Sequence, residues 1–465
     1  MCRCFQIFVF IFLWQQIAFT QKDFVVISLL TIQGNDKTKP EAILREIDFS
    51  VNDTIELINL ASVLLENEKR LKSTGLFSEV DVNLKNWNPD VQEVNVHIIV
   101  KEGWYIYPYV IFELADRNFN VWANEFDYSI QRLNYGVALT HINFSGSKDK
   151  FKAKLQFGFT GKYEMSYEYP YFKNGWGFSS NFFYAYNKEI SYKTFENRPL
   201  FYKADDERNL LSQIRGSFAI TKRKNAYTFH TARLLYFYGK VDSEIPSKLN
   251  SNYFLNGNSV LQFFRLEYEF TYNKLRYPLY PEYGYLWRIN FKKDGFGSSK
   301  KYNNTEISAE YSKHLNFLKR FIYSTRLKIK GNLQRNRIPY LYTQALGYNN
   351  DNLTGYQLYV IDGTDFILMN NSLKFNIFRK DFYFKKWVPK KLRPFNTQIF
   401  LRFNGDMSYV NEPFNRDNNP LSNTFLYGFG PGLDFIFFHN MILTFDFSIN
   451  KLGESGFFVG GGFQF

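Results

Sequence analysis

The chain has 465 residues, of which 20% are aromatic, and its formal net charge is +13. Its mean hydropathy of −0.34 excludes a bundle of membrane helices, whereas few soluble proteins contain so many aromatic residues. A β-barrel with an apolar outer face, a polar interior and aromatic girdles accounts for both values. The basic residues are spread along the chain rather than gathered in one patch, so the charge does not indicate a nucleic-acid-binding protein.

Residues 1–20 are predicted to be a cleaved export signal. Arg3 precedes the apolar run Phe5–Trp14, which is too short to span a bilayer as a helix. The two cysteines of the chain, Cys2 and Cys4, lie in this segment. The mature protein is therefore expected to lack disulfides, catalytic thiols and cysteine-bound metals. No other apolar stretch reaches the ~18 residues that a membrane helix needs.

A small domain with the order β-α-α-β-β is predicted over residues 24–102. Gly34 and Asn35 form a turn signal after its first strand. Leucines at helical spacing, ending with Leu71, give its second helix one apolar face, and Gly75 follows as a C-cap. The predicted elements are strand Val25–Ile32, helices Pro40–Ile47 and Asp53–Leu71, and strands Phe77–Leu84 and Val91–Val100.

The residues at the joints of this domain resemble the POTRA domain of the outer-membrane assembly family typified by BamA and TamA. The matching segments are "IQGNDKT" after the first strand, "LKSTGLFSEV" before the second and "VNVHIIVKE" as the third. Leu71, Phe77 and Val80 belong to the most specific of these segments, although they would also be core residues in any α/β domain of this size. The resemblance implies a domain whose exposed strand edges accept an extended partner segment by β-augmentation.

From residue 105 to residue 465, apolar and polar residues alternate with a period of two, which predicts β-strands. The apolar face is rich in Phe and Tyr in strand after strand, and it needs lipid or a second sheet to cover it. We therefore predict a sixteen-stranded antiparallel transmembrane barrel, since single-chain bacterial barrels have an even number of strands. Residues 121–130 are either an extra strand or part of the second strand.

The sixteen predicted strands are 105–114, 134–143, 151–160, 162–169, 176–187, 211–220, 227–239, 260–273, 284–292, 304–312, 321–333, 366–378, 397–409, 424–437, 440–450 and 457–465. If the small domain lies in the periplasm, odd-numbered strands run outward and long loops should follow them. The connections 188–210, 240–259, 334–365 and 410–423 all follow odd-numbered strands. The basic segment 379–396 is the exception, because it follows an even-numbered strand.

Residues 334–365 resemble the sixth extracellular loop of the same family, which folds back into the barrel lumen. The family signature there is an aliphatic residue, Arg, Gly and an aromatic residue, followed by Asp-Gly and a strand. The matching residues are Leu353, Gly355, Tyr356, Asp362 and Gly363. Thr354 stands in place of the arginine, which in the family reaches an acidic group on the barrel wall. Asn404 is expected at that wall position, with Asp406 as a further candidate partner. If both members of the buried charge pair are replaced, the loss can be nearly neutral and hydrogen bonds can hold the loop.

In the last predicted strand, Phe457, Val459, Phe463 and Phe465 share the outward face. This aromatic end resembles the C-terminal signal by which barrels are recognised for insertion. The glycine run Gly460–Gly462 weakens strand pairing. The resemblance implies that the barrel opens between its first and last strands, so the glycines are consistent with opening. A bend or a close approach to an interior loop explains them equally well.

The resemblance implies an assembly or translocation factor in the outer membrane of a Gram-negative bacterium, with its N-terminal domain in the periplasm. The implied partners are outer-membrane lipids, unfolded outer-membrane or secreted client proteins, and accessory periplasmic proteins. Thr354 and the single POTRA-like domain favour a narrow set of clients over a central, essential insertase. The alternative is a gated transporter or secretion pore for a dedicated protein or solute.

Enzymatic activity is not expected. The five histidines are scattered, no serine lies in a G-x-S-x-G motif, and no His, Asp or Glu cluster has metal-ligand spacing. The sequence therefore predicts no catalytic residue, no cofactor and no metal site.

Overall fold

The computed structural model describes residues 24–88, 92–225, 227–276, 279–296, 302–348, 350–383, 394–414, 419–437 and 441–463. The chain divides into two compact units. The first extends to Tyr105 and includes Ser145–Lys148, and the second comprises Ile106–Phe144 and the chain from Asp149 onward. The predicted export signal and the last residue, Phe465, lie outside the described residues.

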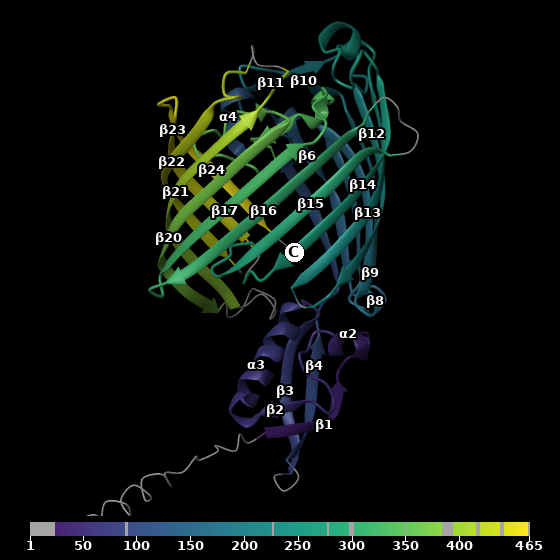
Figure 1. Ribbon diagram of the computed structural model, residues 1–465, viewed down its shortest axis with the longest axis vertical. Coiled ribbons are helices and arrows are strands. Elements are labelled where there is room, and N and C mark those ends of the chain that lie inside the picture. The colour runs from purple at the N-terminus through teal and green to yellow at the C-terminus, as the bar shows by residue number, and fades with distance from the viewer. Residues whose placement is uncertain are drawn as a thin grey trace, which may run out of the picture. The chain divides into compact units, whose positions relative to one another are not determined.

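The first unit is an α/β domain built on a four-stranded sheet (Figure 1). Its elements are β1 (Phe24–Gln33), α2 (Pro40–Leu44), β2 (Thr54–Glu56), α3 (Leu57–Ser73), β3 (Phe77–Asn88) and β4 (Glu93–Glu102). The strand order is β2-β1-β4-β3, with β1 and β4 parallel. Val25, Val94 and Leu60 form a buried cluster between sheet and α3, because the alternating strand residues and the leucine face of α3 meet there.

The longer predicted helix begins at Leu57 rather than at Asp53. Thr54–Glu56 form β2 instead, since their backbone pairs antiparallel with β1. A strand of three residues is too short to show an alternating pattern in the sequence. The strand forms because of its non-local pairing with β1, which the sequence pattern does not reveal. The short helix α2 ends before Ile47, its predicted end.

The second unit contains a sixteen-stranded antiparallel sheet that curls into a barrel, as predicted (Figure 1). Its strands are β5 (Ile106–Leu114), β6 (Leu133–Ile142), β7 (Lys150–Gly158), β8 (Thr160–Lys173), β9 (Trp176–Asn187), β12 (Leu211–Arg223), β13 (Thr228–Val241), β14 (Val260–Asn273), β15 (Gly284–Phe296), β16 (Asn304–Phe317), β17 (Phe321–Asn332), β20 (Asp365–Tyr383), β21 (Pro394–Asn411), β22 (Phe425–Phe437), β23 (Met441–Asn450) and β24 (Ser455–Phe463). Each strand of this sheet is hydrogen-bonded to the strands that precede and follow it in chain order, counting only these sixteen.

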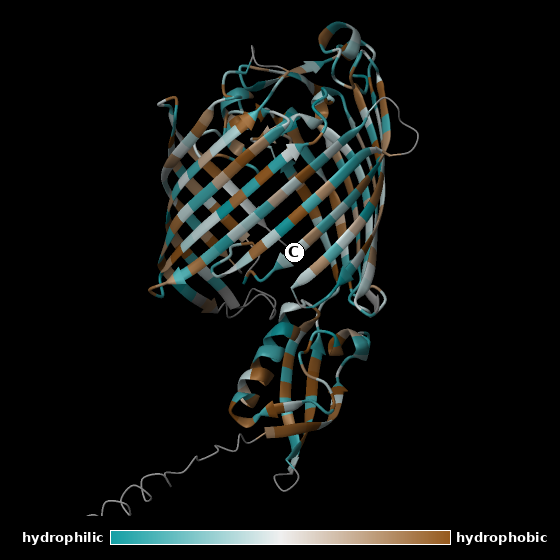
Figure 2. Cartoon of the chain, in the orientation of Figure 1, coloured by the Kyte–Doolittle hydropathy of each residue, from teal (hydrophilic) through white to brown (hydrophobic). Residues whose placement is uncertain are grey.

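Apolar and polar residues alternate along the barrel strands, as Figure 2 shows. In β22, Phe425, Tyr427 and Phe429 are exposed on the outer face, whereas Leu426 between them is buried on the inner face. An outer face of exposed aromatic and aliphatic side chains is the surface that lipid covers in a barrel of this kind. The inner face, called the lumen below, carries the polar side chains.

The long connections gather at one end of the barrel (Figure 1). One of them contains the hairpin β10 (Glu189–Phe195) and β11 (Arg198–Lys203), and another contains the short strands β18 (Gln344–Leu346) and β19 (Ile361–Asp362). The predicted basic connection 379–396 is shorter than expected, because β20 continues to Tyr383 and β21 begins at Pro394. The residues between them lie outside the described part of the chain.

The segment 121–130, predicted as a possible strand, is not a strand. It contains most of helix α4 (Phe119–Glu125) and the start of a 3-10 turn, Ile130–Arg132. The Asn118 side chain accepts a hydrogen bond from the Val121 amide at 2.9 Å and so caps α4. Nowhere in the described chain is a helix both long enough and apolar enough to cross a membrane.

The barrel sheet begins at β5 and ends at β24, and the boundary between these two strands is called the seam. Within the described residues, no ladder of backbone hydrogen bonds joins β5 to β24. Helix α4 contacts β24 here, and the Val459 amide donates to Asn120 Oδ1 at 3.4 Å. The seam is therefore the one place where an edge strand is left without a strand neighbour in the described sheet.

Candidate functional site: the lumen loop and the seam

The connection between β17 and β20, residues 333–364, lies against the inner face of the barrel and is called the lumen loop. Leu353 and Tyr356 are each only 2% exposed. They pack in one apolar cluster with residues of the loop and of β20, β21 and β22. The other buried members of that cluster are Ala345, Leu346, Ile361, Phe366, Leu368, Val410, Leu421 and Leu426. Burial of apolar side chains thus holds the loop to the C-terminal strands.

Thr354 binds the barrel wall at Asp406, a residue that is 7% exposed. The Thr354 hydroxyl donates to Asp406 Oδ2 at 2.6 Å and its amide donates to the same oxygen at 3.1 Å. The Asn371 amide donates to Asp406 Oδ1 at 3.1 Å. The wall therefore keeps an acidic group opposite the loop, and neutral donors take the place of a guanidinium.

Asn404 is the other predicted partner, but its side chain forms no hydrogen bond with the loop within the described residues. Its Nδ2 donates to Asp446 Oδ1 at 3.3 Å. Arg402 binds the same Asp446 oxygen at 2.7 Å and Asp434 at 3.1 Å. Asn404 thus belongs to a separate polar network on the lumen wall, together with Arg402, Asp434 and Asp446.

Two glycines allow the close approach of the loop to the wall. Gly355 adopts a φ of +83°, a conformation that favours glycine, and its carbonyl accepts a hydrogen bond from Asn450 Nδ2 at 3.0 Å. A Cβ on Gly428 of β22 would lie 1.8 Å from the Thr354 carbonyl oxygen. Any larger residue at position 428 would displace the loop.

The rest of the predicted loop motif is also fixed by hydrogen bonds. The Tyr356 hydroxyl donates to the Tyr427 carbonyl at 3.3 Å. Asp362 is buried and accepts from the Tyr348 hydroxyl at 2.9 Å, and the Gly363 amide donates to the Thr343 carbonyl at 2.7 Å. Burial raises the pKa of the Asp362 carboxyl to about 6.

Arg117 lies in the connection between β5 and α4, on the other side of the seam, and its side chain binds the backbone of the lumen loop. Its Nη1 donates to the Tyr359 carbonyl at 2.8 Å and its Nη2 donates to the Leu358 carbonyl at 3.2 Å. The neighbouring Asn118 Nδ2 donates to the Gln357 carbonyl at 2.8 Å. Sequence reasoning missed this arginine, because the family signature places its arginine inside the loop and no local motif marks position 117.

An ion-pair cluster fixes the middle of the loop. Asp351 binds Arg326 at 2.9 Å and Lys328 at 2.6 Å, and both cations point inward from β17. The hairpin β10–β11 adds a further anchor, since the Val360 amide donates to the Asn197 carbonyl at 2.8 Å. These ion pairs and hydrogen bonds therefore fix the loop from Asp351 to Gly363.

A polar cavity of about 610 Å³ lies between the lumen loop, the wall and the seam. Its lining includes Thr354, Asp406, Lys374, Arg402, Asp446 and Gly460. In the part of the chain that the structure describes, no three His, Asp or Glu side chains lie close enough together to hold a metal ion. The cavity offers charges and hydrogen bonds, and its lining includes Ser324, whose Oγ lies 2.8 Å from His314 Nδ1.

In β24, Phe457 is 61% exposed on the outer face and Phe458 is 7% exposed on the inner face. Val459 follows on the outer side at half burial. The side chain of Phe463 lies outside the described set, as Phe465 does. Gly460–Gly462 all pair with β23. A Cβ on Gly462 would meet no described heavy atom within 4 Å, so a close approach of the loop does not explain that glycine.

The residues singled out in the first unit are turn and core positions. Gly34 has a φ of +87°, and the Asn35 side chain donates to the Thr38 carbonyl at 2.9 Å. Gly75 has a φ of +74° and follows α3. Three predicted core residues are buried: Leu71, Phe77 and Val80.

Two family profiles match the chain. Residues 25–103 match POTRA, described as a surface antigen variable number repeat, and residues 143–367 match the Omp85 superfamily domain. A comparison with curated proteins finds no match. Both profiles agree with the family that the sequence motifs predicted.

Solved structures show a similar fold at low sequence identity. BamA from Haemophilus ducreyi lacking POTRA domains 1–3 is 15% identical with a TM-score of 0.57, covering 94% of this chain and 84% of that one. CdiB from Escherichia coli is 11% identical with a TM-score of 0.50, covering 97% and 92%. CdiB from Acinetobacter baumannii is 10% identical with a TM-score of 0.50, covering 94% and 73%.

The Omp85 superfamily comprises non-enzymatic proteins that insert proteins into the outer membrane or secrete them across it. The prediction that the chain is not an enzyme is thereby supported by its family. The POTRA match, the Omp85 match and the sixteen-stranded barrel together identify the chain as an outer-membrane barrel protein of the Omp85 superfamily with a POTRA domain at residues 25–103.

Proposed function

We propose that the protein assembles a narrow set of client proteins into the outer membrane of a Gram-negative bacterium, with its POTRA domain in the periplasm. The observation that carries this proposal is the seam, where β5 and β24 are not joined by a ladder within the described residues. An unpaired strand edge in a bilayer leaves backbone groups without partners, at a cost of several kcal/mol per group. A client strand that adds to β24 would satisfy those groups.

The lumen loop supports the same proposal, because it contacts both sides of the seam. Asn450 and the Tyr427 carbonyl hold it on the β22–β23 side, and Arg117 holds it on the β5 side. A loop held by these contacts would keep its place in the lumen while β5 and β24 separate. Helix α4 would have to release the Val459 amide before a client strand could pair along β24.

The partners follow from these surfaces. Outer-membrane lipids would cover the exposed aromatic face of the barrel, and unfolded outer-membrane or secreted clients would meet the edge of β24. The POTRA domain would receive clients or accessory periplasmic proteins along a strand edge.

Outer-membrane proteomics after depletion of the protein in its native host tests the proposal. A decrease confined to one or a few outer-membrane proteins is the expected result. A general decrease of unrelated barrels would contradict the narrow client set and indicate a general insertase. No change in any outer-membrane protein would contradict assembly altogether.

A gated pore is the second candidate, and the polar cavity of about 610 Å³ beside the lumen loop favours it. Planar-bilayer conductance of the wild type and of a variant lacking residues 349–364 separates the two functions. A pore that opens only in the deletion variant would favour gated transport. A barrel that stays closed in both forms would count against a pore.

A further inference from the structure

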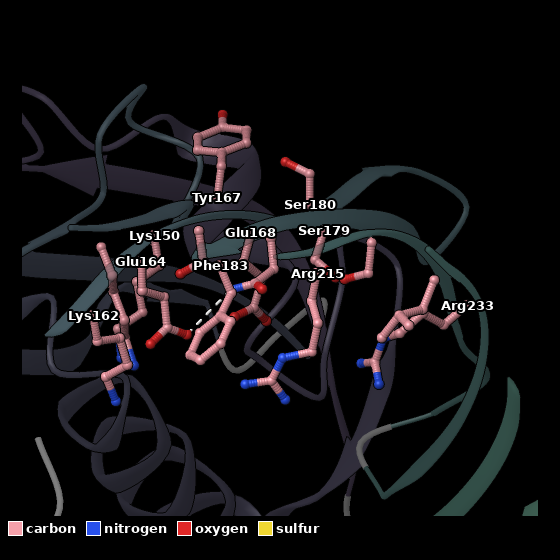
Figure 3. A pocket seen from close by; sticks show the side chains of 15 residues that line it. Lys150, Lys162, Glu164, Tyr167, Glu168, Ser179, Ser180, Phe183, Arg215 and Arg233 are labelled. Atoms are coloured by element: carbon pink, nitrogen blue, oxygen red, sulfur yellow. Dashed lines mark hydrogen bonds between the residues drawn. The ribbon is translucent and has the colours of Figure 1, made fainter. Parts of the chain in front are cut away.

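A second cavity, of about 530 Å³, lies on the opposite part of the lumen wall, formed by β7, β8, β9, β12 and β13 (Figure 3). Five of its lining residues are cations: Lys150, Lys152, Lys162, Arg215 and Arg233. Lys150, Lys152, Lys162 and Arg215 have no ion pair with any described carboxylate, whereas Arg233 and several cations elsewhere in the lumen do. The paired lumen cations are Arg233, Arg265, Arg288, Lys292, Arg326, Lys328 and Arg402.

Arg215 is the clearest sign that a ligand is expected here. Its guanidinium lies over the Phe183 ring at 3.7 Å, and its Nε is buried without a hydrogen-bond partner among the described residues. Figure 3 shows the charged ends of Arg215 and Lys162 pointing the same way as Arg233, whereas Tyr167 and Ser180 point away. A buried cationic donor without a partner is costly, and an anionic oxygen would satisfy it.

The other lining residues restrict the kind of anion. Glu164 and Glu168 lie among the cations, and Asn181 Nδ2 donates to Glu164 at 3.2 Å. A compact polyanion would be repelled by these carboxylates, whereas separate carboxylates on an extended chain can reach the cations individually. Lys150 and Lys152 are two residues apart on one strand, about 6.6–6.8 Å, which is also the repeat of alternate side chains in an extended peptide.

Hydroxyl groups complete the wall. Ser166 and Ser217 line the same cavity and lie opposite Asn181 in their ladders, so they can hydrogen-bond with a peptide backbone. We infer that this cationic wall binds an acidic, extended polypeptide segment inside the lumen. The inference deepens the proposed function, on which it rests, by naming the chemistry of the client segment that the barrel accepts.

Fluorescence anisotropy with the full-length mature protein in detergent tests the inference. The probe is a fluorescein-labelled ten-residue peptide of alternating Glu and Ser, with a Lys-Ser peptide of the same length for comparison. The double variant Lys162→Gln/Arg215→Gln is expected to bind the acidic peptide at least about tenfold more weakly, because two charge-assisted contacts are lost. Raising NaCl from about 50 to about 500 mM is expected to weaken wild-type binding, since charge interactions are screened.

The matched control is Arg288→Gln/Lys292→Gln, which removes two lumen cations that already have carboxylate partners. Its affinity is expected to match the wild type, and heat-modifiable gel mobility verifies that each variant is folded. Equal peptide affinity of the Lys162/Arg215 variant and the wild type would overturn the inference, as would an equal loss in both double variants. Displacement of the peptide by equimolar inorganic pyrophosphate would overturn the peptide assignment in favour of a phosphorylated ligand.

These outcomes are independent of the depletion experiment. If depletion lowers client levels but the acidic peptide does not bind, only the acidic-segment inference fails. If the peptide binds at this wall but depletion changes no outer-membrane protein, assembly fails and the wall becomes part of a secretion path.

Discussion

Thr354 replaces a charged partner of the barrel wall with a short hydroxyl, and the geometry shows how the loop tolerates this change. Asp406 accepts three hydrogen bonds from neutral groups, so its buried carboxylate is not left without donors. The bond from the threonine hydroxyl is the shortest of them. The attachment of the loop therefore depends on this hydroxyl rather than on a long charged side chain.

Replacing Thr354 with Val removes the hydroxyl while keeping the shape of the side chain. We expect a loss of about 1.5–3 kcal/mol in the free energy of unfolding, the usual range for a hydrogen bond to a charged group. Guanidinium unfolding followed by tryptophan fluorescence measures it. Thr354→Ser keeps the hydroxyl and should unfold close to the wild type. Equal stability of the valine variant and the wild type would show that the hydroxyl bond to Asp406 does not hold the loop.

Arg117 offers a second test on the same loop. Arg117→Met keeps most of the side-chain stem but loses the donors to the Leu358 and Tyr359 carbonyls. Backbone amides of residues 344–362 should then exchange hydrogen faster, because the loop opens locally more often. Lys188→Met, which removes an exposed cation paired with Glu207, is the control. Unchanged exchange in the Arg117 variant would contradict its role in holding the loop.

At the scale of elements, β24 combines a weak ladder with an open edge. A glycine inside a strand costs roughly 0.5–1 kcal/mol relative to alanine, and Gly462 has space for the added methyl group. We expect Gly462→Ala to raise the free energy of unfolding by that amount and to slow client assembly, since β24 becomes harder to deform. Gly428→Ala should destabilise instead, because its Cβ would meet the Thr354 carbonyl. A Gly462 variant that is more stable but assembles clients at the normal rate would separate β24 pairing from function.

The elements that could be predicted are those whose pattern is local and long. Sixteen alternating segments were found because each strand has one lipid-facing side, and that constraint acts on every second residue. Helix α4 was missed because its short sequence, Phe119–Glu125, also fits a strand, and its form depends on the Asn118 cap. The same limit applies to the site: the loop motif is contiguous, whereas Arg117 reaches it from more than 200 residues away.

At the scale of the whole molecule, the two units contain carboxylates that respond to acid in opposite directions. Partial burial by itself would raise the pKa of Glu102 in the first unit, but hydrogen bonds from Thr38 and Lys37 outweigh it and lower the pKa below 4.5. Burial raises the pKa of Asp362 in the lumen loop from 3.8 to about 6. Glu102 therefore stabilises the first unit above its ordinary pKa, and that contribution is lost as the pH falls through the lowered value.

For Asp362 the sign is reversed. The folded loop holds a proton that the unfolded chain has already lost, so the contribution of Asp362 is complete below pH 3.8 and disappears as the pH rises through about 6. As the pH falls from 7 to 5, hydrogen exchange in residues 344–362, corrected for its intrinsic rate, should therefore slow. The corrected exchange rate of the first unit should not change over this range. Below about pH 4.5 the first unit should exchange faster. Asp362→Asn should abolish the first effect only, and Glu102→Gln the second only. A loop whose exchange keeps its pH dependence in the Asp362→Asn variant would show that another group controls it.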